Sequence, residues 1–203
     1  MDSSSRRERK KAETRQRISD VGTMLFMERG FDDVTIGDIA EAADVSKVTV
    51  FNHFPRKEDI FFDREPEAAD LLSTTVRERP HGTSVLAAVH AMLLRQIAQG
   101  HPLGGMEDRF TTFWRVILAS PVLRARAREA GEELEGLLTT LIAESDDDPD
   151  PRLSAALIVA GFRAVFQQIA TRLLAGERAD DLREEYVARV NHTFEALDRA
   201  LRR

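Results

Sequence analysis

The stretch that decides the fold is residues 34–60, VTIGDIAEAADVSKVTVFNHFPRKEDI. Thr35 is followed three residues later by Asp38, the spacing at which a hydroxyl and a carboxylate cap the start of a helix. Ser46 can cap a second short helix, and Pro55 ends it. The stretch therefore predicts two short helices joined by a tight turn.

Such a pair of helices has the shape of a helix-turn-helix, whose second helix fits the major groove of DNA. Side chains near the start of that helix reach base edges, while the first helix and flanking N–H groups bind phosphates. A longer helix precedes the pair: its apolar face includes Ile18, Leu25 and Phe26, and Gly30 is a suitable C-terminal stop. Together these elements predict a three-helix DNA-binding domain.

This region resembles the DNA-binding signature of the TetR (tetracycline-repressor-like) family of bacterial transcriptional regulators. Pairs of residues fall at the family's spacing in four places: Ile39-Ala40, Val45-Ser46, His53-Phe54 and Lys57-Glu58. The close match covers roughly a quarter of the chain. It implies a regulator that binds double-stranded DNA at an inverted repeat as a homodimer. The family diverges in the rest of the chain, which binds a small-molecule effector.

Two residues depart from the family's pattern. Asp44 stands in the turn where many members have Gly. Asp tolerates the left-handed backbone better than most residues, so we expect the turn to survive. Phe51 stands where many members have Tyr, so a hydroxyl that would donate to a phosphate is absent. The ring of Phe51 can still pack on a sugar or on a thymine methyl group.

The resemblance implies a set of residues that face the groove or bind the DNA backbone. For Thr35 and Ser46 the alternative role is helix capping alone. For His53 it is packing against the preceding helix, and for Lys57 it is that of a solvated surface lysine. Most such contacts position a protein on DNA, and few specify sequence. The predicted DNA-binding residues are Thr35, Ser46, Lys47, Val48, Thr49, Phe51, Asn52, His53 and Lys57.

The start of the chain is basic, although the whole chain carries a net charge of −6. Residues 1–17 hold seven Lys or Arg and three Asp or Glu, a balance of +4. A basic arm on an acidic protein indicates local contact with nucleic acid, through the DNA backbone or the minor groove. The alternative is a solvated, frayed terminus.

Beyond residue 83 the apolar spacing predicts longer helices, at 83–99, 104–119, 121–144, 152–175 and 180–201. The helix at 152–175 is apolar nearly all round, which predicts burial on every side. The last helix has apolar residues spaced 3-4-3-4, the pattern of a helix–helix seam. We expect this seam to be a subunit interface, with the core of a single chain as the alternative. The predicted interface residues are Val187, Val190, Phe194, Leu197 and Leu201.

Aromatic side chains gather on two of these helices and are the candidate lining of an effector cavity. Arg115 and Arg163 can add polar anchors. The alternative is that the aromatic residues are ordinary core. The candidate effector-binding residues are Phe110, Phe113, Trp114, Phe162, Phe166 and Gln167.

Composition and spacing disfavour several other classes of protein. The 203 residues include no cysteine, which excludes disulfides and thiolate-bound metals. The five histidines lack zinc-site spacing, and the proline-flanked acidic run at 146–148 indicates a solvated loop. The glycines at 100–105 lack the ending of a phosphate loop. No catalytic constellation is present, so we expect no enzyme, no metal and no cofactor. No uninterrupted apolar run approaches the ~18 residues that span a bilayer, and no signal peptide is expected.

The sequence thus predicts an all-α protein of about nine helices, with a three-helix domain followed by a helical bundle. We expect residues 1–55 to bind DNA and residues 56–203 to bind the effector and form the dimer. The predicted function is that of a cytoplasmic repressor released by a small, largely apolar effector. Three alternatives are an enzyme or small-molecule binder built on a helical bundle, an interaction module that has lost DNA binding, and an activator of the same fold.

Overall fold

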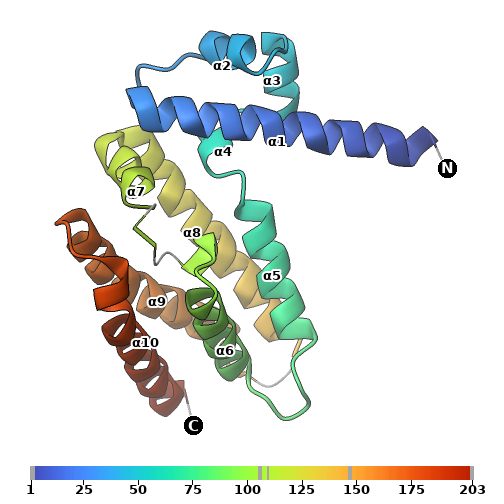
Figure 1. Cartoon of the computed structure of the whole chain (residues 1–203). Helices are drawn as coiled ribbons and strands as arrows, with labels where there is room; N and C mark the ends of the chain where they lie inside the picture. The colour runs from blue at the N-terminus through green and yellow to red at the C-terminus, as the bar shows by residue number, and fades with distance from the viewer. Residues whose placement is uncertain (1–2, 105–106, 109, 146–147, 202–203) are drawn as a thin grey trace. The chain divides into compact units, whose positions relative to one another are not determined.

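The computed structural model describes residues 3–104, 107–108, 110–145 and 148–201. In that part of the chain the structure is helical throughout, with no β-strand, which confirms the all-α prediction (Figure 1). The helices are α1 (Ser3–Arg29), α2 (Ile36–Ala42), α3 (Lys47–His53), α4 (Glu58–Phe61), α5 (Glu65–Arg77), α6 (Val85–Ala98), a 3-10 turn η1 (Pro102–Gly104), α7 (Phe110–Ala119), α8 (Pro121–Ala143), α9 (Pro151–Leu174) and α10 (Ala179–Leu201).

The chain forms two compact units, and each unit consists of two separate stretches of sequence. The first unit holds Met1–Arg64 together with Val116–Arg126. The second holds Glu65–Arg115 and Ala127–Arg203. The end of the DNA-binding domain at residue 55 stays a prediction, while the first compact unit also takes in α4 and the junction of α7 with α8.

The core of the first unit lies where α1 meets α4. Gly22 on α1 makes this possible, because a Cβ there would stand 2.6 Å from Ile60 Cγ2. Ile60 is fully buried, as is Phe26, whose ring lies 5.7 Å from the ring of Phe61. Helix α4, Glu58–Phe61, is a single turn. Pro66 lacks an N–H, which suits the first turn of a new helix better than the interior of α4.

The segment Val116–Arg126 is held in the first unit by polar contacts. Ser120 Oγ donates to Asp32 Oδ1 at 3.1 Å, and Arg126 Nε donates to Asp59 Oδ1 at 3.1 Å. Arg126 is only 5% exposed. Burial raises the pKa of Asp59, but hydrogen bonds from Arg56 and Arg126 outweigh it and leave the pKa below its ordinary value.

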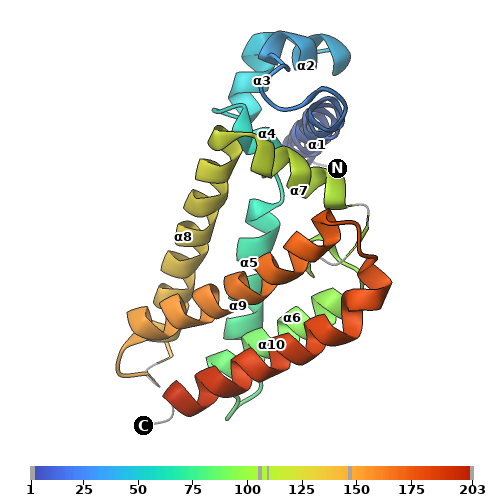
Figure 2. The same ribbon diagram turned by 90° about the vertical axis from the view of Figure 1, so that its left-hand side faces the viewer.

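The second unit is a helical bundle in which α9 and α10 run side by side (Figures 1 and 2). Gly161 allows α10 to come close, because a Cβ there would lie 3.0 Å from Thr193 Cγ2. Tyr186 on α10 is fully buried, and its hydroxyl donates to the carbonyl of Gly104 at 3.3 Å. Burial raises the pKa of that phenol.

Helix α9 passes the length and composition test for a membrane span, with a mean hydropathy of 1.5 over 18 residues. Its longest uninterrupted apolar run is short, because polar residues such as Arg163 and Gln167 interrupt it. In the structure the buried residues of α9, such as Ile158 and Ile169, belong to the core of the second unit. A core helix of a globular protein passes the same test.

Helix α7 begins at Phe110, later than the predicted residue 104. Gly100 has a φ of +59°, and η1 follows it at Pro102–Gly104. Residue 104 is thus the last residue of η1 and not the start of α7.

Candidate nucleic-acid interface and effector site

The first helix of the motif, α2, begins with the capping box that the sequence predicts. Asp38 N donates to Thr35 Oγ1 at 3.2 Å, and Thr35 N donates to Asp38 Oδ2 at 2.8 Å. The Thr35 hydroxyl also donates to Asp38 Oδ2 at 2.6 Å, and this hydrogen bond, followed by that from Thr35 N, lowers the pKa of the Asp38 carboxyl. The turn after α2 contains Asp44 with a φ of +51°. Asp44, which stands where many family members have glycine, therefore adopts the left-handed conformation. Thr35 itself is exposed, so capping leaves its surface accessible.

The second helix of the motif, α3, buries one face and exposes the other. Ser46 Oγ accepts a hydrogen bond from Thr49 N at 3.0 Å and lies 2.8 Å from Thr49 Oγ1. Val50 is fully buried, whereas Val48 is 68% exposed and Phe51 50% exposed. Of the other predicted contacts, Lys47 and Asn52 are exposed, and Thr49 is half-buried.

Lys57 has a structural task that the sequence did not predict. Its Nζ donates to the carbonyls of Phe31 at 2.8 Å and Val34 at 2.9 Å, and it lies 4.0 Å from the centre of the Phe31 ring. Burial lowers the pKa of this ammonium group. The side chain fastens the loop between α1 and α2, and two of its three donors are used there. These bonds span 26 and 23 residues, so no local sequence pattern marks them.

His53 connects the end of α3 with α1. Its backbone carbonyl accepts a hydrogen bond from Arg15 Nη1 at 2.6 Å. The guanidinium of Arg15 also lies 4.1 Å from the centre of the Phe54 ring. The imidazole of His53 is half-buried, and burial, followed by the charges of Lys11 and Arg15, lowers its pKa. The backbone of His53 is thus tied to α1, while the role of its imidazole on DNA stays a prediction.

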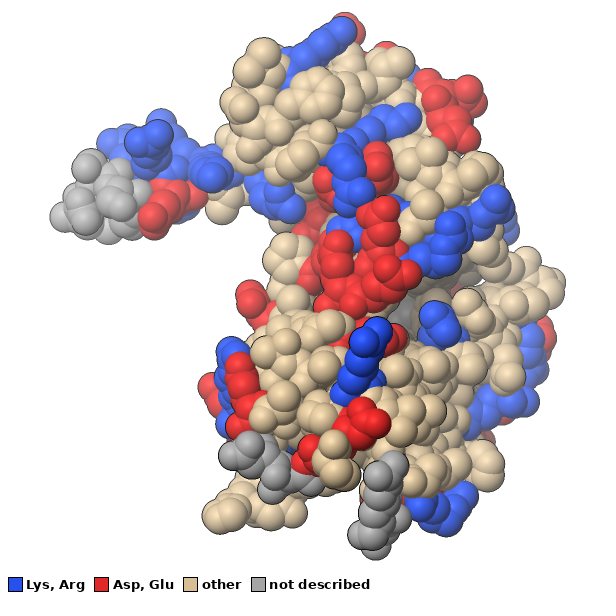
Figure 3. Space-filling view, turned by 180° about the vertical axis from the view of Figure 1, so that it is seen from behind, with Lys and Arg blue, Asp and Glu red and all other residues tan. Residues whose placement is uncertain are grey.

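The basic start of the chain is part of α1. Figure 3 shows its lysines and arginines gathered on the projecting end of that helix. Arg9 pairs with Glu13 at 3.6 Å, with both side chains about two-thirds exposed. The basic side chains that are exposed along this part of α1 are Arg6, Arg7, Arg9, Lys10, Lys11 and Arg17.

Four of the six candidate effector residues form one cluster in the second unit. Trp114 lies 4.7 Å from Phe166 and 5.2 Å from Phe113, measured between ring centres. Phe162 lies 6.0 Å from Phe166. Phe110 stands half-buried at the start of α7, whereas Gln167, like Arg115 and Arg163, is exposed. The structure therefore brings α7 and α9 together through aromatic rings.

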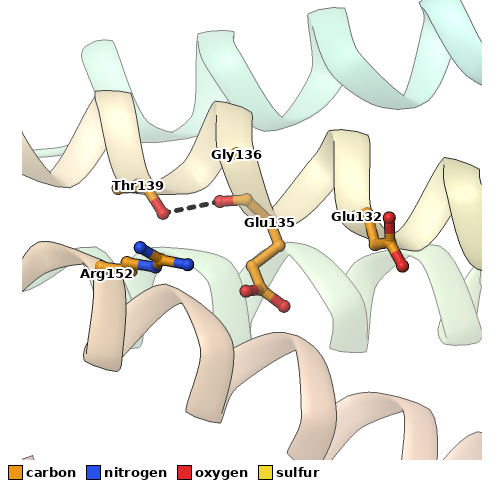
Figure 4. Close-up of a pocket in the computed structure, with 5 residues that line it drawn as sticks. All are labelled: Glu132, Glu135, Gly136, Thr139 and Arg152. Atoms are coloured by element: carbon orange, nitrogen blue, oxygen red, sulfur yellow. Dashed lines mark hydrogen bonds between the residues drawn. The ribbon is translucent and has the colours of Figure 1, made fainter.

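A hollow of about 440 Å³ lies elsewhere in the second unit, between α8 and α9. Figure 4 shows its five lining residues: Glu132, Glu135, Gly136, Thr139 and Arg152. The hydroxyl of Thr139 is turned to the helix and donates to the carbonyl of Glu135 at 2.8 Å. Sequence reasoning missed this hollow, because its residues read as part of an ordinary charged helix face.

The predicted interface seam is largely part of the chain's own core. Val190 is 1% exposed and Phe194 2% exposed, and the Phe194 ring stacks on His90 at 4.8 Å. Val187, Leu197 and Leu201 are half-buried against the same core. A 3-4 apolar spacing shows that a helix packs against something, but it does not identify the partner as the same chain or another. The use of this seam by a second subunit stays a prediction.

Within the described residues no group of three metal-ligating side chains comes together. Asp146 and Asp147 of the acidic run, and Gly105 of the glycine run, lie outside the described residues. Asp148 accepts hydrogen bonds from Asp150 N at 2.8 Å and from Ser154 Oγ at 2.6 Å. It thus helps to form the start of α9.

Residues 18–63 match the family model described as bacterial regulatory proteins, tetR family. The chain is also 30% identical, over 167 residues, to the HTH-type transcriptional regulator TcmR of Streptomyces glaucescens; the match covers 78% of this chain and 72% of that protein. The chain belongs to the TetR family. It is therefore a transcriptional regulator with a helix-turn-helix DNA-binding domain.

Solved structures share the whole fold with this TetR-family chain. The SmeT–triclosan complex matches with a TM-score of 0.60 at 16% identity, over 91% of each chain. The FadR repressor of Thermus thermophilus, solved with lauroyl-CoA, matches with a TM-score of 0.51 at 22% identity, over 87% of this chain and 92% of that one. At these identities the likeness concerns the fold alone.

Proposed function

We propose that this regulator is a repressor that binds an inverted-repeat operator as a homodimer in the cytoplasm and is released by a small effector. The exposed face of α3 carries the DNA-binding part of the proposal. Val48 and Phe51 are at least half exposed on a helix of seven residues whose other face is buried. In a major groove such apolar side chains meet thymine methyl groups, while Lys47 at the helix start meets phosphates.

The remaining predicted contacts fit the same orientation of α3. Thr49 and Asn52 lie along the helix within reach of base edges, and Thr35 and Ser46 present exposed hydroxyls at the two helix starts. The exposed basic end of α1 adds charge next to this face, because Lys11 and Arg15 approach the end of α3. His53 and Lys57 support the motif from behind, and Lys57 keeps one donor for a phosphate.

Two observations support a dimer and an effector. On α9, Leu153 is 42% exposed and Ala164 is exposed, so this apolar helix is not fully covered by its own chain. A second copy would cover it, as a two-fold interface requires. The aromatic cluster of α7 and α9 supports an effector site in residues 56–203. SmeT with triclosan and FadR with lauroyl-CoA are ligand complexes of the same fold.

Selection of bound sequences from a random duplex pool tests the proposal. We expect an enriched inverted repeat, with half-sites about one helical turn apart and affinity that falls steeply with salt. The Val48→Ser and Phe51→Ser variants should lose the preference for particular bases while their melting temperatures stay unchanged, because both side chains face solvent. Equal affinity of the wild type for its best selected site and for random duplex would overturn the proposal.

A further inference from the structure

The indole N–H of Trp114 is a buried donor with no partner. Trp114 Nε1 is shielded from solvent and makes no hydrogen bond to any described residue. Most buried polar groups in folded proteins are hydrogen-bonded, and the N–H of a buried tryptophan usually finds an acceptor. An exception of this kind calls for an explanation, and a ligand that supplies the missing acceptor is one.

The aromatic rings around this donor are only partly buried. Trp114, Phe113, Phe162 and Phe166 are each half-buried, although they contact one another. A closed core would exclude solvent from most of these rings. The planes of Trp114 and Phe166 are inclined at 63°, and those of Phe113 and Trp114 at 89°. The cluster therefore presents both ring faces and ring edges, the two elements that aromatic partners prefer.

We propose that Trp114 is the polar recognition group of the effector site, and that the effector is a flat aromatic compound with a carbonyl or phenolic oxygen. The oxygen accepts the indole hydrogen bond while the ligand rings pack on Phe113, Phe162 and Phe166. An indole N–H can only donate, so ammonium compounds and others that offer donors alone are excluded. This inference rests on the proposed function, to which it adds the chemical class of the effector.

The hollow beside α8 would take a different class of compound. Its charged side chains, Glu132, Glu135 and Arg152, would favour a ligand with charges of its own. The two sites are therefore distinguishable by variants, and binding at the hollow is an outcome of the test.

The test uses two probes that differ only in their acceptor oxygens. Anthraquinone with a 2-trimethylammonium group carries two ring carbonyls as its acceptors, and anthracene with the same group has the same ring skeleton and no acceptor oxygen. Trp114 is the single tryptophan of the chain, so quenching of its fluorescence reports binding at the cluster. We expect the wild type to bind the quinone about 3- to 10-fold more tightly, the range of one hydrogen bond.

Two variants assign the preference to a residue. Trp114→Phe keeps a ring and removes the donor, so it should bind both probes with equal affinity, as measured by calorimetry. Glu135→Gln, in the hollow, should leave both affinities unchanged. The proposal is overturned if Trp114→Phe retains the preference for the quinone, or if Glu135→Gln abolishes binding.

Nuclear magnetic resonance of the wild type tests the same proposal without a variant, in case Trp114→Phe folds poorly. The single tryptophan gives one indole N–H resonance, separate from those of the backbone amides, in a ¹H–¹⁵N spectrum of the full chain. The quinone should move its proton downfield and slow its exchange, whereas anthracene should cause only a ring-current shift. The same result with both probes, or no shift with either, overturns the inference. Operator binding is measured in parallel: its absence counts against the proposed function, whereas its presence without a quinone effect counts only against the role of Trp114.

Discussion

The helix-turn-helix and the second unit differ in how far apart in the sequence their key partners are. In the helix-turn-helix, Thr35 caps through Asp38 and Ser46 through Thr49, each three residues away. In the second unit, the hydrogen bond between His90 and Asn191 spans 101 residues, and that from Tyr186 to Gly104 spans 82. Local partners leave a readable pattern, whereas distant ones are set by packing that no single stretch encodes.

The largest effect is expected at Phe194, in the part of the α10 seam that the chain's own core buries. The substitution Phe194→Glu should destabilise the second unit by at least ~4 kcal/mol, because it removes a buried ring that stacks on His90 and buries a charge. Chemical denaturation followed by circular dichroism measures this loss.

The matched control is Ala164→Glu, on the exposed side of α9. It should leave the melting temperature nearly unchanged and yield monomers in sedimentation, if α9 forms the dimer. A well-folded Phe194→Glu monomer would reverse this assignment and return the seam to the subunit interface.

The second prediction concerns Lys57. The sequence predicts that this side chain binds DNA, whereas in the structure it donates to two backbone carbonyls more than 20 residues away. Lys57→Met should lower the stability of the first unit by about 2 kcal/mol, because two backbone carbonyls lose a charged donor. The control Lys47→Met, at an exposed position, should leave stability unchanged and reduce the salt dependence of DNA binding by about one phosphate contact. If Lys57→Met behaves like the control, its main partner is a phosphate.

These two cases show what the sequence could and could not predict. The helix-turn-helix, its caps and the left-handed Asp44 follow from residues within a few positions of one another. The aromatic cluster was predicted in part, since α7 and α9 each carry rings in register, but their contact is a matter of packing. Other features depend on which helices meet: the burial of Phe194, the carbonyl partners of Lys57 and the hollow at Glu135. Apolar spacing alone does not determine that.

The third prediction is a pH effect in the first unit. The pKa of Asp59 is lower in the folded chain than its ordinary value, owing to Arg56 and Arg126. An unfolded chain therefore binds more protons at this site, so stability rises with pH in the acid range. The contribution is complete above the unfolded pKa, near 4, and is lost as pH falls through the folded pKa.

The variant Asp59→Asn should lose about 2 kcal/mol at neutral pH, since the hydrogen bonds from two guanidinium groups weaken. It should also show a smaller fall in stability between about pH 5 and pH 2 than the wild type. Parallel acid unfolding curves for the two proteins would mean that the pair with Arg126 contributes little.

The smallest effect is expected from Phe51→Tyr, which restores the hydroxyl found in many members of the family. Phe51 is 50% exposed, so an added hydroxyl meets no buried surface and stability should not change. On DNA the hydroxyl can donate to a phosphate, a bond worth about 1 kcal/mol, or roughly fivefold in affinity. Because phosphates carry no sequence information, the gain should be equal for the best operator and for single-base variants. Fluorescence anisotropy with such a set of duplexes measures it. A gain confined to some sequences would place the hydroxyl itself, and not only the ring, against base edges, and no gain would place the tip of residue 51 away from a phosphate.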